Sequence, residues 1–289
     1  MDNLDLLYKE YKPLLFSIAY RMLGSVSDAE DMVHDTFLSA QRVPEEEVRH
    51  PKAYLCKMVV NRCIDYAQSA RKQREVYVGP WLPEPLLAGG DPQHDVERGE
   101  TLSYAFMVCL ETLTPVERAV FILREAFAYA YAEIAEVVGK TEANCRQLYR
   151  RVKRGLQDGL PAPQPDLAAS RRLLDEFLHA ARTGDMALLL RSLSEDAALY
   201  SDGGGKAQAA TKPIVGPKRV VAFLLGLGAK GYNRSELDIV LMNGQFGVLM
   251  KEDGRLATVV TWEADGEGRI RRLYLLRNPD KLRNLARNV

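Results

Sequence analysis

The sequence predicts a multidomain protein in which two all-α helical domains precede a C-terminal α+β domain. A length of 289 residues suits two or three domains. Apolar residues recur at helical spacing through residues 4–74 and 114–156, and segments rich in proline and glycine separate the predicted domains. Beyond residue 168, helices are followed by short apolar runs between turns, an α+β pattern. The predicted boundaries are 1–75, a linker at 76–100, 101–160, a second linker at 161–167, and 168–289.

The first predicted helix ends at Gly24, and a capping box formed by Ser27 and Glu30 predicts the start of the next, which continues to about residue 41. One face of this second helix is acidic. The acidic residues on it are Asp28, Asp31 and Asp35. They are explained either as a solvated stripe that favours the helix N-terminus or as a docking surface for a basic or polar partner helix. The residues alone support both explanations equally.

The third predicted helix follows Pro51 and changes from apolar to basic along its length, ending near Arg74. The chain is neutral overall, with 39 basic and 39 acidic residues, yet residues 49–74 hold seven basic residues and one acidic residue. Aromatic rings beside cations suit a single-stranded nucleic acid, because rings stack on unpaired bases while cations follow the phosphates. Burial is the commoner role of any one tyrosine. The candidate nucleic-acid contacts are Lys57, Asn61, Arg62, Arg71, Lys72 and Arg74.

Residues 114–156 predict a helix-turn-helix unit. Thr114 and Glu117 form a capping box with Pro115 at the first helical position, so a helix is expected to begin there. A short helix over Tyr131–Val138 is expected to end at Gly139, which can adopt the left-handed conformation of a helix C-cap. Thr141 then caps a third helix, with one apolar stripe facing the core.

The polar face of that third helix predicts binding to a DNA major groove. Residues 140–154 hold six basic residues and one acidic residue, and Asn or Gln can bond base edges in pairs while arginines reach bases or phosphates. A solvated basic face is the alternative. The candidate contacts are Asn144, Arg146, Gln147, Arg150, Arg151 and Arg154.

Several classes of site are disfavoured by the sequence. Cys56, Cys63, Cys109 and Cys145 are scattered without a C-x-x-C pair, which disfavours a zinc site or a disulfide framework. No apolar run approaches the roughly 20 residues of a membrane span, and the N-terminus lacks a signal-peptide pattern. We therefore expect no cofactor and no metal ion, and by elimination a cytoplasmic location.

The first linker carries Trp81, a large ring that we expect to dock on a surface rather than remain in solvent. In the C-terminal domain the predicted helices cover residues 168–182, 185–193 and 216–229, and the predicted strands cover residues 197–201, 237–242, 246–251, 256–264 and 270–276. Turn signals between the later strands predict an antiparallel sheet.

Residues 11–43 and 53–74 resemble the second conserved region of sigma-70 type factors of the extracytoplasmic function group, and residues 113–156 resemble their fourth region. Asn61 and Asp65 match the family pattern N-x-x-x-D, whereas Tyr54 stands where tryptophan is common and Gln68 where arginine is common. The resemblance implies that residues 53–74 bind the minus-10 element and the 113–156 helix-turn-helix the minus-35 element. The loop at residues 43–50, with the N-x-x-x-D asparagine and the arginine after it, would capture a flipped base.

The same resemblance decides between the two explanations of the acidic helix. In these factors that helix docks on the clamp helices of the RNA polymerase largest subunit, so Asp28, Asp31 and Asp35 become candidate polymerase contacts. No catalytic residue is implied, because the polymerase makes the bonds.

The C-terminal domain resembles the cone-shaped SnoaL-like members of the NTF2-like superfamily. Three motifs, WLPEP in the linker, DGGGK at residues 202–206 and NPDKL at residues 278–282, resemble the signature of a sigma subgroup with a fused SnoaL-like extension. The resemblance implies that the extension regulates the factor in cis, with the linker docked on it; whether it binds a small molecule is left open. The implied regulatory residues are Trp81, Pro83, Asp202, Lys206, Asn278, Asp280 and Lys281.

Two other functions compete with this interpretation. One is a ligand-responsive helix-turn-helix regulator that acts without polymerase, which would leave the acidic and basic helices of residues 28–74 unexplained. The other is a SnoaL-like isomerase or cyclase fused to a DNA-binding module, which would need a carboxylate base within reach of an acidic carbon. The candidates for such a site are Asp202, Tyr200, Trp262 and Tyr274, none of which lies in a discriminating motif.

Overall fold

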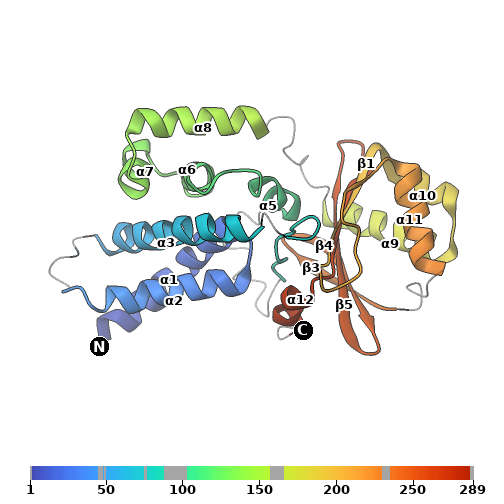
Figure 1. Ribbon diagram of the computed structural model, residues 1–289, viewed down its shortest axis with the longest axis horizontal. Coiled ribbons are helices and arrows are strands. Elements are labelled where there is room, and N and C mark those ends of the chain that lie inside the picture. The colour runs from blue at the N-terminus through green and yellow to red at the C-terminus, as the bar shows by residue number, and fades with distance from the viewer. Residues whose placement is uncertain are drawn as a thin grey trace. The chain divides into compact units, whose positions relative to one another are not determined.

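The computed structural model describes residues 2–44, 48, 50–74, 77–87, 103–156, 166–229 and 235–286 (Figure 1). The chain forms two units, one made of Met1–Val76 and Cys109–Leu160, the other of Tyr77–Val108 and Pro161–Val289. The helices of the first unit are α1 (Asp2–Leu23), α2 (Val26–Ala40), α3 (Pro51–Arg74), α6 (Pro115–Glu125), α7 (Tyr131–Val138) and α8 (Glu142–Leu156). Helix α5 (Tyr104–Leu110) begins in the second unit and ends in the first.

The helix-turn-helix of the first unit begins and ends at the predicted residues. Thr114 and Glu117 form a complete capping box at the start of α6. Gly139 ends α7 with φ of 63°, in the left-handed region that residues with a Cβ seldom adopt. The Thr141 hydroxyl accepts a hydrogen bond of 3.2 Å from the Asn144 backbone N–H and so caps α8. These local predictions are confirmed.

The predicted start of α2 is wrong by two residues. Gly24 ends α1 in the left-handed conformation, with φ of 68°, and leaves only Ser25 before the next helix. Ser25 has extended backbone angles, and its hydroxyl accepts a hydrogen bond from the Asp28 N–H. Ser25 is therefore the N-cap, and Ser27 lies within the first turn.

The two helical parts of the first unit pack against each other. Helix α1 contacts α6, and helix α3 contacts α6 and α7. The Arg118 side chain, 4 % exposed, donates 2.7 Å to the Arg21 carbonyl and forms a 2.5 Å ion pair with Glu111. The Arg21 guanidinium lies over the Phe127 ring, 5.2 Å from its centroid. A buried, hydrogen-bonded arginine therefore joins segments that lie about a hundred residues apart.

The second unit contains a six-stranded sheet. Its elements are α9 (Leu167–Thr183), α10 (Met186–Ser192), β1 (Leu193–Asp202), β2 (Ile214–Val215), α11 (Pro217–Ala229), β3 (Glu236–Met242), β4 (Gln245–Glu252), β5 (Arg255–Ala264), β6 (Ile270–Leu276) and α12 (Pro279–Ala286). The strand order is β2-β1-β6-β5-β4-β3.

Strands β3 to β6 form the predicted antiparallel meander, but β1 pairs with β6 in parallel. The antiparallel prediction concerned the later strands and is confirmed for them. The pairing of β1 was not predicted. Tight turns fix the direction of successive strands, whereas β1 reaches β6 only through the long intervening chain, which allows either direction. As a result Asp202 lies beside Leu276, and the chain leaves both strands at the same end.

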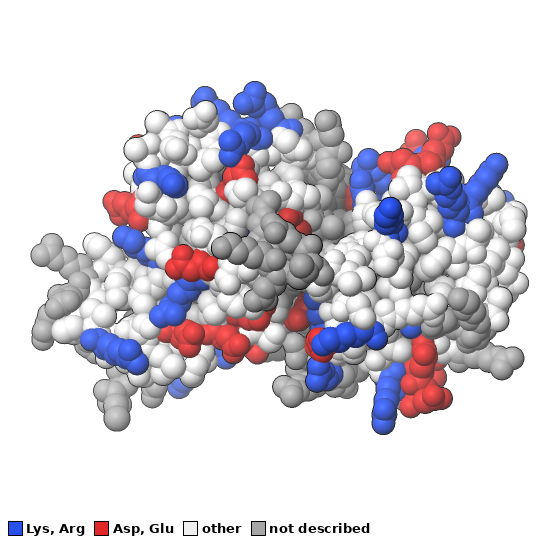
Figure 2. All heavy atoms as spheres, in the orientation of Figure 1, with Lys and Arg blue, Asp and Glu red and all other residues white. Residues whose placement is uncertain are grey.

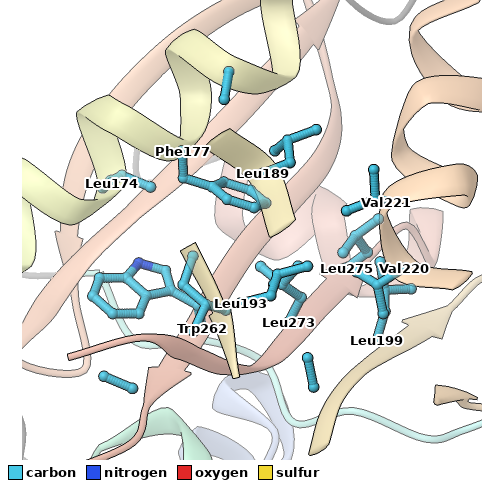
Figure 3. Close-up of a cluster of buried hydrophobic side chains, with 14 of the residues drawn as sticks. Leu174, Phe177, Leu189, Leu193, Leu199, Val220, Val221, Trp262, Leu273 and Leu275 are labelled. Atoms are coloured by element: carbon cyan, nitrogen blue, oxygen red, sulfur yellow. The ribbon is translucent and has the colours of Figure 1, made fainter. Parts of the chain in front are cut away.

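The sheet buries both of its faces. Helices α9, α10 and α11 cover one face, where Phe177, Leu189 and Val221 pack against Trp262, Leu273 and neighbouring strand residues (Figures 1 and 3). The other face is covered by the linker, α5 and α12, which contribute Leu82, Tyr104 and Leu282 to a second apolar cluster around Leu249 and Tyr274. Side chains of successive strand residues point to opposite faces, so β1 and β6 each supply both clusters.

Candidate functional site

The polar face of α8 is exposed (Figure 2). Asn144, Arg146, Gln147, Arg150, Arg151 and Arg154 are all exposed, and blue Lys and Arg atoms gather over this helix. The opposite stripe holds Cys145, Val152 and Leu156, which are buried. The helix therefore presents its candidate base-reading and phosphate-binding residues together, with the apolar stripe fixing its orientation.

Three acidic residues hold part of the basic face in place. Arg151 forms an ion pair of 2.5 Å with Glu117, and Arg146 pairs with Glu142. Burial raises the pKa of the Glu117 carboxyl, but hydrogen bonds from Thr114 and Arg151 outweigh it and lower the pKa below its ordinary value. Lys153 pairs with Glu125 at 3.1 Å. These exposed pairs are weak and can exchange for phosphate contacts at small cost.

The candidate minus-10 residues lie along α3. Lys57 is exposed, while Asn61 and Arg62 are half-buried. Arg62 donates a 2.5 Å hydrogen bond to the hydroxyl of Ser39, which joins α3 to α2. The side chains of Arg71, Lys72 and Arg74 lie outside the described residues, as do residues 45–47 and 49 of the loop expected to capture a flipped base. The described part of the site is therefore the middle of α3.

The acidic face of α2 is open to solvent. Asp31 and Asp35 are exposed, Asp28 is half-buried, and red acidic atoms gather over α2 in Figure 2. The opposite face buries Ala29, Val33 and Phe37. Because the apolar face is already used for packing, the acidic face is the one available to a partner.

A buried carboxylate holds the linker against the second unit. Asp202 is fully buried, and its two oxygens accept hydrogen bonds from the Tyr77 hydroxyl at 2.6 Å, the Leu82 N–H at 3.0 Å, the Gly204 N–H at 3.0 Å and the Lys281 ammonium at 2.8 Å. Asn278 donates 2.8 Å to the same Tyr77 hydroxyl. We name these residues the Asp202 cluster: Tyr77, Trp81, Leu82, Asp202, Asn278 and Lys281.

Lys281 is the cation of the Asp202 cluster. The residue is 7 % exposed, and its ammonium also donates a hydrogen bond of 2.5 Å to the Leu82 carbonyl. The ammonium lies 3.8 Å from the centroid of the Trp81 ring and 5.6 Å from that of Tyr77. A desolvated cation over two rings adds attraction to the ion pair. The linker tryptophan is thus held by a charge from α12.

The remaining implied regulatory residues lie around this cluster. Lys206 and Asp280 form an exposed ion pair with each other, and the Lys206 contact lowers the pKa of Asp280. The Pro83 carbonyl accepts a 2.7 Å hydrogen bond from the Tyr104 hydroxyl. Gly204 has φ of 60°, and a Cβ there would overlap the Asn278 side chain. Glycine is required at this turn because the linker-binding asparagine occupies the space.

Farther along, the linker pairs with the sheet itself. The Leu86 N–H donates 2.8 Å to the Asn243 side-chain oxygen, and the Asn243 N–H donates 2.9 Å to the Leu86 carbonyl. Leu87 forms a bridge with Met242. The linker therefore adds a short extended segment beside the turn between β3 and β4.

Comparisons with known proteins agree with this arrangement. The Sigma-70 region 2 model matches residues 7–73, and the Sigma-70 region 4 model matches residues 103–156. The ECF RNA polymerase sigma factor SigJ of Mycobacterium tuberculosis is 35 % identical over 284 residues, covering 92 % of this chain and 89 % of the relative. The chain belongs to the extracytoplasmic function sigma factors. It is thus a transcription initiation factor that acts with RNA polymerase and promoter DNA.

Two further comparisons show how much of this sigma factor resembles each of two relatives. The crystal structure of Mycobacterium tuberculosis SigJ is 30 % identical, covers 96 % of this chain and 97 % of its own, and superposes with a TM-score of 0.76. The probable ECF sigma factor SigI of the same species is 29 % identical over 195 residues, covering 66 % of this chain and 67 % of its own. The likeness to SigJ therefore includes the C-terminal part of the chain.

The four residues raised for an isomerase or cyclase site do not form one in this sigma factor. Asp202 belongs to the linker-binding cluster, and Tyr200 and Tyr274 pack in the apolar cluster on the linker face. Trp262 is buried on the opposite face and donates to the Phe246 carbonyl. The sheet separates Trp262 from the other three, so they share no pocket.

Tyr77 and Asn243 were not predicted as linker contacts. Tyr77 lies four residues before the tryptophan that was singled out, and its ring at the start of a linker was an available signal. Asn243 precedes a glycine, a pair typical of hairpin turns, and its contact with a segment 157 residues away carries no local signal.

A membrane-crossing helix is not found among the described residues, nor is a group of His, Cys, Asp or Glu side chains that could hold a metal ion.

Proposed function

We propose that this sigma factor binds core RNA polymerase through α2, the minus-10 element through α3 and the minus-35 element through α8, and that its SnoaL-like domain regulates it through the linker. The corresponding functional segments are residues 1–75, 101–160 and 168–289, joined at 76–100 and 161–167. The cytoplasm, where the polymerase acts, is the expected location. The observation that carries the regulatory part is the burial of Asp202 and Lys281 around linker backbone atoms.

Polymerase binding is assigned to the exposed carboxylates of α2. Asp31 and Asp35 lie one turn apart on the face of α2 opposite to its buried apolar residues. Asp28 extends the same face toward the helix N-terminus. A basic partner helix, as the clamp helices of the largest subunit provide in this family, complements this charge. Electrostatic complementarity of this kind raises association rates and fixes register.

DNA binding is assigned to two separate faces. Asn144 and Gln147 on α8 supply base-reading amides, with Arg146, Arg150, Arg151 and Arg154 around them for bases or phosphates. On α3 the melted strand is assigned to the exposed Lys57 and the half-buried Asn61 and Arg62. Arg71, Lys72 and Arg74 at the basic end of the helix complete this assignment.

Charge reversal on α2 tests the polymerase assignment. The double variant Asp31→Lys and Asp35→Lys is expected to bind core polymerase at least tenfold more weakly, since each reversed charge replaces attraction by repulsion. Affinity of the full chain for purified core polymerase, measured by fluorescence anisotropy, is the direct measurement. Asp175→Lys on α9, an exposed acidic residue of the other unit, is the matched control and should leave the affinity unchanged.

Binding of the unmodified chain to core polymerase also tests the first rival function. A regulator that acts without polymerase would form no stable complex with the core enzyme, and no promoter-dependent transcript would appear. An enzyme of the SnoaL-like type would keep its transcriptional output in the double variant Asp202→Ala and Trp262→Ala while losing turnover of a small carbonyl compound. Formation of the complex and loss of regulation in the Asp202 variant would support the proposal.

A further inference from the structure

A cavity lies between the sheet and helices α9 and α11, on the face opposite the linker. Its volume is about 240 Å³. This exceeds the roughly 150 Å³ of an apolar cavity that takes up benzene, so one ring with a short chain can enter. Phe177, Leu273 and Leu275 of its wall belong to the apolar cluster of Figure 3.

The described wall of the cavity has few polar groups, and those that are charged are positive. Apart from apolar side chains and glycine, the described residues that line it are Arg182, Ser201, Gln208, Thr258 and Arg277. None of the described residues that line it is acidic, so they offer no carboxylate base for proton abstraction, and the two arginines favour an anion. The wall is therefore suited to binding rather than to acid–base turnover.

Two of these residues point to the position of a ligand's polar group. The Ser201 hydroxyl is buried, the residue being 1 % exposed, and has no hydrogen-bond partner among the described residues. Arg277 is half-buried and is held at the wall by hydrogen bonds of 3.2 Å to the Thr258 hydroxyl and 2.5 Å to the Gln208 carbonyl. A buried hydroxyl without a partner is costly unless a ligand or water satisfies it.

The cavity is coupled to the Asp202 cluster through the backbone. Ser201 lines the cavity, and the next residue is Asp202; Arg277 lines it, and the next residue is Asn278. The Arg277 N–H donates 2.7 Å to the Asp202 carbonyl and so joins the two strand ends. Because neighbouring strand residues face opposite sides of a sheet, one residue step separates the cavity from the linker.

A second connection runs through the loop after Asp202. Gln208, Ala209 and Ala210 line the cavity. On its other side the same loop approaches the linker at Gly79, where an added Cβ would lie 3.4 Å from the Thr211 Cα. A molecule that packs against this loop is thus one layer of backbone away from the linker.

We propose that the cavity binds a small apolar monocarboxylate, with the carboxylate at Ser201 and Arg277, and that occupancy strengthens the hold of the Asp202 cluster on the linker. This deepens the proposed function, because it rests on the linker being the regulated element. The carboxylate accepts from the Ser201 hydroxyl and the Arg277 guanidinium, a charge-assisted contact, while the ring or chain fills the apolar part.

The binding test uses the full chain, 4-phenylbutyrate and its neutral amide, with calorimetry as the readout. The carboxylate is expected to bind at least tenfold more tightly than the amide, and Arg277→Gln should abolish that preference. Ser201→Ala should weaken carboxylate binding roughly fivefold without lowering the Tm, because the hydroxyl has no partner to lose. Arg271→Gln, on the strand that Arg277 directly follows but outside the cavity wall, is the matched control and should change nothing. Absence of saturable binding, or equal affinity for acid and amide, overturns the site.

Hydrogen exchange tests the coupling. Saturating 4-phenylbutyrate should slow exchange in residues 77–87 at least threefold, and Trp81→Ala should weaken 4-phenylbutyrate binding by the reciprocal linkage. Binding with unchanged exchange overturns the coupling. Neither measurement requires polymerase, so failure here is distinguishable from failure of the sigma-factor assignments, which depend on the complex with core enzyme.

Discussion

Asp202→Ala is expected to lower the free energy of unfolding of the second unit by about 3–5 kcal/mol, because it leaves the buried Lys281 ammonium without its carboxylate. The substitution also removes the acceptor of the Tyr77 hydroxyl and the Leu82 N–H, so the linker loses its main polar attachment. Chemical denaturation followed by far-ultraviolet circular dichroism measures the first effect. Hydrogen exchange in residues 77–87 measures the second, which should accelerate at least tenfold.

Two comparison variants make this prediction specific. Asp238→Ala breaks another Asp–Lys ion pair of the same sheet, with 2.7 Å between Asp238 and Lys251, in which the aspartate is exposed and the lysine half-buried. This variant should lower the free energy of unfolding by less than about 1 kcal/mol. The double variant Asp202→Ala and Lys281→Met removes the unpaired charge and should recover part of the lost stability while the linker stays released. An Asp202→Ala effect no larger than that of Asp238→Ala would contradict the assigned role.

The double variant Asn144→Ala and Gln147→Ala is expected to lower transcription from promoters that depend on the minus-35 element by roughly 10- to 100-fold. The reason is that a side-chain amide that makes two hydrogen bonds to one base contributes about 1–3 kcal/mol of discrimination against the wrong base. Both residues are exposed, and neither belongs to the buried stripe of α8, so the fold should be unaffected. Run-off transcription with core polymerase is the measurement, with thermal unfolding as the check on folding.

Arg154→Ala is the matched comparison on the same helix. A phosphate contact is insensitive to sequence, so this variant should weaken binding to cognate and random DNA about equally and reduce the salt dependence by about one counterion. The Asn144 and Gln147 variant should instead lose affinity for cognate DNA alone. Equal losses on both DNAs in the double variant would show that these amides do not contact base edges.

The parts of this fold that were predicted correctly depend on residues close in sequence. The capping box of Thr114 and Glu117, and the left-handed Gly139, each act within a few residues, so the limits of α6 and α7 follow from local chemistry. The start of α2 failed because two serines could each cap it, and only the backbone conformation after Gly24 selects Ser25. Local competition between equivalent caps cannot be resolved from a motif.

The features that were not predicted depend on residues far apart in sequence. The parallel pairing of β1 with β6, the burial of Arg118 against α1, and the contact of Tyr77 with a carboxylate 125 residues away all require the tertiary fold. The motif resemblance pointed to Asp202, Asn278 and Lys281 but carried no information on which atom each would bind. The cavity was not predicted at all, because its wall is assembled from two helices, a loop and five strands.

The regulatory proposal predicts that the held linker restricts the distance between the two DNA-binding parts. Trp81→Ala removes the ring that packs under the Lys281 ammonium and should release the linker while leaving the helices of the first unit folded. Val78→Ala, at an exposed linker position, is the matched control.

The most direct measurement is run-off transcription with core polymerase on a set of promoters that differ only in the spacing between the minus-35 and minus-10 elements. The natural chain should show a sharp optimum at one spacing, and Trp81→Ala should lower the ratio of optimal to neighbouring spacings at least threefold, while Val78→Ala should leave that ratio unchanged. An identical spacing profile for the natural chain and for Trp81→Ala, with linker release verified by hydrogen exchange, would contradict the account.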